Sequence, residues 1–174
     1  MVKIKFTAAA VASAALLFNI AQAADGTINF TGNITDQACT VDTASANQTV
    51  NLGNVSSKAF AAAGDVAAPT KFSINLTDCP LTVTQARVKF DGTTNSTNQA
   101  ILALSSGQTA TNVGVALYEA DSTTPIPVAS ASASQTITTV GPNVLNFVAK
   151  YMATTASVGT GTANAVTNFT VNYN

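Results

Sequence analysis

The chain offers few residues for acid–base or nucleophilic chemistry. It contains no histidine, so neither a Ser-His-Asp triad nor a Cys-His pair is available. Glu119 and Asp121 lie two residues apart and could form a carboxylate pair of the glycosidase kind. Two neighbouring acids beside a turn are more often solvated surface groups. We therefore predict that the protein is not an enzyme and has no small-molecule substrate.

The cysteines, Cys39 and Cys79, are the remaining reactive side chains. In an exported chain two cysteines favour a disulfide. The enclosed loop of about 40 residues would stabilise the fold by about 4 kcal/mol. The alternatives are two free thiols or half of a metal site, and the absence of histidine argues against a metal. We expect no metal and no cofactor.

Export itself is indicated by the first residues. A short basic start precedes an uncharged stretch over residues 7–20, and Ala21-Gln22-Ala23 forms a small-x-small cleavage motif. The stretch is too short to span a membrane comfortably, which argues against the alternative of a transmembrane anchor. We predict a secretory signal peptide over residues 1–23, with cleavage between Ala23 and Ala24.

The composition of the mature chain excludes several classes of partner. Cleavage removes Lys3 and Lys5 and leaves five basic residues against eight acidic ones, a net charge of −3. The basic residues are scattered, which argues against nucleic acid or an anionic membrane as a partner. With 47% hydrophobic and 9% charged residues, the chain has enough apolar surface to fold, and its length suits one domain.

Alternation of apolar and polar residues with a period of two dominates this domain, as in strands with one buried face. The alternating stretches cover residues 72–77, 86–90, 113–117, 145–151 and 169–173. Turn-forming clusters separate them, and no long helical stretch occurs. We predict an all-β sandwich, with one helical turn near residues 56–62 and a surface connection over residues 61–69.

The two ends of the mature chain are also predicted strands. Ile28, Phe30, Gly32 and Ile34 would share one face of the first strand, and the last strand ends with Tyr173 and Asn174. From periodicity alone, both segments could be ordinary terminal strands of a closed sandwich.

Five stretches of the chain resemble the type 1 fimbrial major subunits (pilins) of the chaperone–usher pathway. The resemblance extends across the mature chain and depends on the order of the stretches, the cysteine spacing and the penultimate tyrosine. The stretches are Gly26-Thr27-Ile28-Asn29-Phe30-Thr31-Gly32, Cys39-Thr40-Val41, Gln48-Thr49-Val50-Asn51-Leu52-Gly53, Phe72-Ser73-Ile74-Asn75-Leu76-Thr77-Asp78-Cys79, and the ending from Asn164 to Asn174.

This resemblance implies an incomplete immunoglobulin-like β-sandwich that lacks its final strand. A periplasmic chaperone would fill the open groove first, and the N-terminal extension of the next subunit would fill it in the fibre. The implied partners are neighbouring pilin subunits, the chaperone and an outer-membrane usher. The implied location is a fimbrium on the cell surface, reached through the periplasm, where the fibre would support cell adhesion.

The resemblance also assigns residues to these roles. The N-terminal extension, residues 24–35, would be the donor strand, with groove-facing positions at Ile28, Phe30, Gly32 and Ile34. The pilin domain, residues 36–174, would bind the chaperone through Gly161, Phe169, Val171 and Tyr173. The disulfide of the family matches Cys39 and Cys79. Only Ala24-Asp25-Gly26 precede Thr27, fewer residues than in many members, so the number of filled groove positions is not fixed.

Two alternatives remain open from the sequence. The chain could be a minor subunit of the same system, an adaptor or a terminator, and a terminator should lack a fully open groove. It could instead be a self-contained secreted carbohydrate-binding module, although the absence of tryptophan leaves such a surface poorly supplied with aromatic side chains.

Overall fold

The computed structural model describes residues 26, 28–32 and 38–174. The chain divides into a first unit that ends at Ile34 and a second unit, the domain, that runs from Thr35 to Asn174. Each is described by itself. Within the described ranges, no helix has the length and apolar character needed to cross a membrane.

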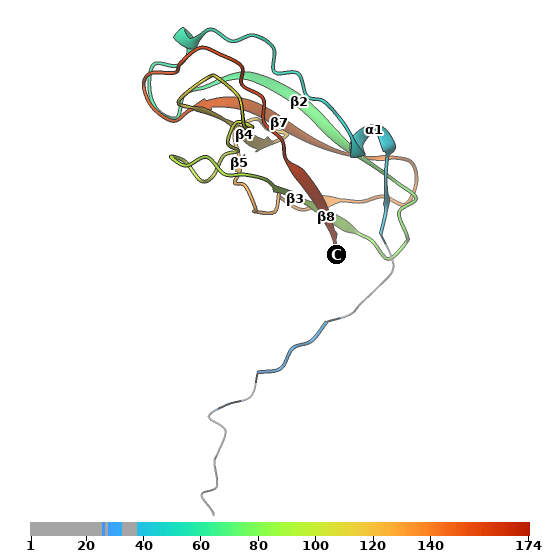
Figure 1. The fold of residues 1–174 in the computed structure, drawn as a ribbon. Coiled ribbons are helices and arrows are strands. Elements are labelled where there is room, and N and C mark those ends of the chain that lie inside the picture. The colour runs from blue at the N-terminus through green and yellow to red at the C-terminus, as the bar shows by residue number, and fades with distance from the viewer. Residues whose placement is uncertain (1–25, 27, 33–37) are drawn as a thin grey trace, which may run out of the picture. The chain divides into compact units, whose positions relative to one another are not determined.

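The domain consists mainly of β-strands (Figure 1). Its two helical segments each make up a single short turn. In chain order the elements are β1 (Thr40–Val41), α1 (Thr43–Ala46), the 3₁₀ turn η1 (Ser57–Ala59), β2 (Val66–Thr77), β3 (Gln85–Asp91), β4 (Val113–Glu119), β5 (Pro125–Ile126), β6 (Gln135–Thr136), β7 (Asn143–Ala153) and β8 (Asn168–Tyr173).

These strands form two antiparallel sheets, which confirms the predicted sandwich. The larger sheet has the order β1-β2-β7-β4-β5, and the smaller has the order β6-β3-β8. The longest pairing joins β2 to β7, from Val66 opposite Met152 to Leu76 opposite Asn143. All five alternating stretches predicted from the sequence lie in strands, namely in β2, β3, β4, β7 and β8.

The core lies between the two sheets. Phe72, Phe90 and Phe147 form its aromatic centre, with ring centroids 5.1 to 6.0 Å apart. Phe90 and Phe147 are at most 1% exposed. The inward-facing side chains of β3 are thus buried, as the period of two requires. Those of β2 and β7 are mostly buried, although Phe72 and Tyr151 are only partly buried.

Two details of the fold differ from the sequence-based expectations. The predicted connection over residues 61–69 is wrong from Val66, because β2 begins there. A register shift between Ala67 and Thr70 lets the strand accommodate Pro69, and Ala68 adopts a positive φ of 55° at this bulge. The short helix α1 was not predicted, whereas η1 lies within the helical turn expected near residues 56–62.

Candidate functional site

The strand β8 is the edge of the smaller sheet and pairs only with β3 in residues 38–174. Its inward side chains, Phe169, Val171 and Tyr173, are half-buried and pack against the core. Their cross-strand neighbours are at most 1% exposed: Phe90, Val88 and Ala86. A row of apolar side chains on β8 is therefore only partly covered.

The backbone of β8 has hydrogen-bonding groups to spare on its outer edge. Gln85 and Asn174 exchange two backbone hydrogen bonds, with N···O distances of 3.2 and 3.0 Å. Bonded and non-bonded pairs alternate in an antiparallel ladder, so Asn168, Thr170 and Asn172 also bond to β3. The N–H and C=O groups that face the outer edge are consequently those of Phe169, Val171 and Tyr173.

In β3, by comparison, the outward-facing backbone groups of the paired residues are hydrogen-bonded to a neighbouring segment. The backbone N–H of Val88 donates to the Ser132 hydroxyl at 2.9 Å, and the Val88 carbonyl accepts from the Ser132 N–H at 2.8 Å. The Phe90 carbonyl accepts from Ala129 N–H at 2.8 Å. In the part of the domain that the structure describes, β3 is therefore hydrogen-bonded along both edges and β8 along one.

The region around β1 and α1 forms the opposite wall of the site. A hollow of about 330 Å³ is lined by Val41, Ala46, Thr167, Asn168 and Phe169. Near the other end of β8, the Tyr173 hydroxyl donates to the Cys39 carbonyl at 3.4 Å. The wall was not predicted from the sequence, because two strand residues and a four-residue helix are too short to give a periodic signal.

A disulfide between Cys39 and Cys79 ties this wall to the end of β2. The Asn143 amide donates to the Cys79 sulfur at 3.4 Å and so links the start of β7 to the disulfide. Burial raises the pKa of Tyr173, and its hydrogen bond to Cys39 acts in the opposite direction. The phenol therefore remains neutral at physiological pH and serves as a donor.

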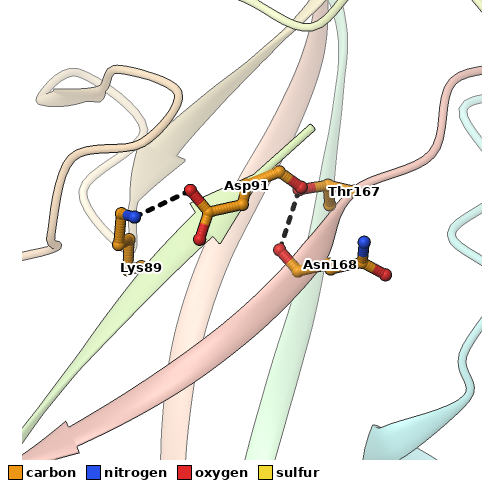
Figure 2. A network of polar contacts seen from close by, with 4 residues as sticks. All are labelled: Lys89, Asp91, Thr167 and Asn168. Atoms are coloured by element: carbon orange, nitrogen blue, oxygen red, sulfur yellow. Dashed lines mark hydrogen bonds and ion pairs between the residues drawn. The ribbon is translucent and has the colours of Figure 1, made fainter. Parts of the chain in front are cut away.

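Polar contacts fix the point at which β8 begins (Figure 2). The Thr167 hydroxyl lies 3.0 Å from the Asp91 carbonyl and 3.1 Å from the Asn168 carbonyl. The Asp91 carboxylate also forms an ion pair with Lys89 at 2.9 Å. These contacts hold the first residues of β8 against the end of β3, so the open edge is attached to a fixed frame.

Gly161 lies in the segment that leads into β8. A Cβ atom at this position would collide with Ala110 N and with Thr109. The two segments are joined there, since Thr109 N–H donates to the Thr162 carbonyl at 3.2 Å. Close packing inside the domain thus accounts for the glycine, and its assignment to chaperone binding stays a prediction.

The two acids considered for catalysis accept hydrogen bonds from loop residues. Glu119 Oε1 accepts from the Ala133 N–H at 2.6 Å. The side-chain and backbone hydrogen bonds from Thr124, followed by the backbone bond from Thr123, hold the pKa of Asp121 well below its usual range. In the described parts of the chain, no three metal-ligating side chains gather in one place. What the site offers is a hydrogen-bonding edge beside an apolar row.

Residues 28–174 match the model of the family described as "Fimbrial protein". The chain belongs to this fimbrial protein family. It is 35% identical to long polar fimbria protein A of Salmonella typhimurium, over 99% of this chain and 97% of the relative. The crystal structure of a Burkholderia pseudomallei type I fimbria protein is 41% identical, with a TM-score of 0.62, over 85% of this chain and 97% of that chain.

A subunit of a chaperone–usher pilus shares the fold, with a TM-score of 0.66 and 24% identity over 87% of this chain and 96% of that chain. The neighbours are pilins with an immunoglobulin-like fold, as the resemblance implied. This fimbrial protein is a structural subunit of a cell-surface fimbrium, with other pilin subunits as its partners.

The predicted donor residues of this fimbrial subunit lie in the first unit. Ile28 is 79% exposed and Phe30 is 91% exposed. Gly32 is exposed as well, and a Cβ atom there would meet nothing within 4 Å. Ile34 and the cleavage site between Ala23 and Ala24 lie outside the described residues. Their roles, and the division at residues 23 and 35, stay predictions.

Proposed function

We propose that copies of this subunit polymerise by donor-strand exchange. Residues 26–34 of one copy lie along the outer edge of β8 in the next copy, between β8 and the wall formed by β1 and α1. The observation that carries the proposal is the outer edge of β8, which pairs with no strand of the described domain, beside its half-buried apolar row. An added strand satisfies both features at once.

The physical gain from such a strand is substantial. Phe169, Val171 and Tyr173 each supply one backbone donor and one acceptor, and a net hydrogen bond contributes about 0.5–1.5 kcal/mol. Ile28 and Phe30 expose most of their surface, and burial of such a side chain contributes about 1.5–3 kcal/mol. Gly32, two residues after Phe30, lets the two backbones approach closely at the next groove position.

The same edge explains why a newly exported subunit needs protection. An open strand edge with apolar side chains promotes pairing with the wrong chain. In our proposal the signal peptide, residues 1–23, directs export, and a periplasmic chaperone covers β8 through Phe169, Val171 and Tyr173. An outer-membrane usher then exchanges the chaperone strand for residues 26–34 of the next copy. The open edge also favours a subunit that allows continued growth over a terminator.

Deletion of residues 26–34 tests strand donation. The deleted subunit keeps its own groove, so we expect it to bind the chaperone and to form no fibres under electron microscopy. A sharper variant replaces Ile28 and Phe30 with Ala. Its matched control replaces Asn29 and Thr31 with Ala, the polar residues that alternate with them in the sequence. The control should assemble and the first variant should not. Normal fibres from the deletion would refute strand donation.

Tyr173→Ala tests the acceptor side separately. Loss of its half-buried ring weakens the row that the chaperone covers, so we expect a lower periplasmic level of the subunit. Thr170→Ala, on the outward face of β8, is the control. Equal periplasmic levels of the two variants would count against the role of Tyr173.

A further inference from the structure

The wall formed by β1 and α1 is attached to β2 by side chains where its backbone pairing ends. Only two residues of β1 pair with β2. The Asp42 N–H then donates to the Asn75 carbonyl at 2.9 Å, and the chain turns into α1 beside β2 (Figure 1). Residues 48–55 form no backbone–backbone hydrogen bond with any residue that the structure describes. The position of the wall therefore depends on other contacts.

Ser45 of α1 provides the first of these contacts. Its hydroxyl accepts from the Asn75 N–H at 2.9 Å, and the residue is 3% exposed. The hydroxyl thus occupies the place on the edge of β2 where a paired strand would put a carbonyl. Asn75 Oδ1 is buried and has no hydrogen-bond partner among the described residues. Loss of the hydroxyl would leave a second polar group of Asn75 without a partner, which is costly inside a protein.

Gln48 provides the second contact, one turn further along the chain. Its side-chain amide donates to the Ser73 carbonyl at 3.0 Å and to the Ser45 carbonyl at 3.4 Å. Ser73 lies two residues before Asn75 on β2, so the two contacts continue the pairing of β1 along the same edge. Two side chains here replace a backbone ladder.

The position of the wall determines the shape of the site. The hollow of about 330 Å³ has Val41 and Ala46 on the side of the wall, and Phe169 at the start of β8 on the other side. A strand paired with β8 lies about 4.7–4.9 Å from it. The distance from β8 to the wall therefore decides whether the side chains of that strand fit. Ala46 directly follows Ser45, so the hydroxyl contact with β2 also locates the lining of the hollow.

We propose that Ser45 and Gln48 are positioning residues for strand exchange, which hold the wall at the separation from β8 that the incoming strand requires. This inference rests on the proposed function and adds two polar side chains to it that act through the wall. Because the wall is in place before the strand arrives, binding does not have to order it. A subunit whose wall is in place for only a fraction of the time would bind the strand more weakly by that fraction.

Peptide binding to a full-length subunit tests the proposal. Ile28→Ala combined with Phe30→Ala disables the subunit's own donor strand, so a peptide with the parent sequence of residues 26–34 can be titrated into the empty groove. Ser45→Ala in this background should weaken the affinity about tenfold. Most of the loss should appear in the association rate, because fewer subunits have the wall in place. Loss of a direct contact with the strand would raise the dissociation rate instead.

Gln48 gives a second test that does not depend on a buried position, because the residue is exposed. Gln48→Ala should weaken the affinity about threefold. Gln48→Glu keeps the size of the side chain, removes the donor and should weaken binding at least as much. Thr43→Ala and Thr49→Ala, exposed changes in the same segment, are the matched controls and should bind as the background does.

Unchanged affinity in Ser45→Ala and in both Gln48 variants would overturn the proposal. A lower melting temperature together with unchanged affinity would show that these residues only stabilise the domain. If Ser45→Ala does not fold, the comparison of the Gln48 variants with Thr49→Ala decides alone. Failure of the peptide to bind the donor-disabled background would instead overturn strand donation itself, so the two failures are distinguishable.

Discussion

The strands β3 and β8 lie side by side in one sheet, and both alternate apolar and polar residues, yet their burial differs. Ala86, Val88 and Phe90 of β3 are at most 1% exposed, whereas Phe169 and its inward neighbours on β8 are half-buried. The difference arises at the outer edges. Residues 129–137 bond to the outer edge of β3, while the outer edge of β8 has no partner in residues 38–174.

This contrast indicates which part of the fold the domain completes by itself. The aromatic centre and the pairing of β2 with β7 need nothing from another chain. The row on β8 needs a partner strand to reach the burial that β3 already has. Folding stability should therefore depend mainly on β3, and assembly mainly on β8.

Of these variants, Phe90→Ala should lower the free energy of unfolding the most. Phe90 is 1% exposed and packs on Phe72 and Phe147. Truncation of a buried phenylalanine costs about 3–5 kcal/mol through lost burial and a residual cavity. We expect the free energy of unfolding in denaturant to fall by this amount with and without a bound partner strand. A change below 1 kcal/mol would contradict the placement of the core.

Gly161→Ala should cause the second-largest loss of stability. The added methyl group would collide with the backbone of Ala110 and with Thr109, and overpacking of this kind costs about 1–3 kcal/mol. Gly107→Ala is a less informative control because its φ is +83°. Gly26→Ala, with open space around it, is the better one. If Gly161→Ala left thermal unfolding unchanged but abolished chaperone binding, the glycine would be a contact residue instead.

Phe169→Ala should separate stability from assembly. Its ring is half-exposed in the free domain, so we expect a loss of only about 1 kcal/mol in unfolding free energy. With a complementing strand the ring becomes buried, and the affinity should fall by about tenfold, which corresponds to 1.4 kcal/mol. Titration of a peptide of residues 26–34 into a subunit that lacks them measures this. Thr170→Ala should bind as the parent does.

Tyr173→Phe should have the smallest effect at neutral pH, less than about 1 kcal/mol, because only the hydrogen bond to Cys39 is lost. The stability of the variant should differ most from that of the parent in alkaline solution. Burial raises the pKa of Tyr173 above 10, so the contribution of the neutral phenol is complete below pH 10 and is lost as pH rises through the raised value. The variant should flatten the decline of unfolding free energy above pH 10. A residual decline from Tyr118 and Tyr151 should persist.

The sequence predicted which stretches form alternating strands better than it predicted where those strands begin. A period of two identified β2, β3, β4, β7 and β8, because each carries at least five alternating residues with one row that packs against the core. It did not predict the start of β2 at Val66, since Pro69 and the small residues around it suggest a connection. The bulge with Ala68 at positive φ depends on the pairing of β2 with β7, which no local sequence pattern specifies.

The candidate site was predictable on one side only. Phe169, Val171 and Tyr173 follow from alternation, and family resemblance supplied their meaning. That β8 has no outer partner within residues 38–174 depends on the order of strands in the sheet, which periodicity does not encode. The opposite wall, with Val41 and Ala46, is built from elements of two and four residues, and a pattern needs a longer stretch to emerge.

The disulfide also has a mechanical consequence. In a fibre built by strand exchange, tension enters each domain through the segment that precedes Cys39. The two-residue pairing of β1 with β2 would yield easily if it carried this load. The bond from Cys39 to Cys79 instead transmits the load covalently to the end of β2, whose long ladder with β7 is pulled in shear, the direction in which many hydrogen bonds resist together.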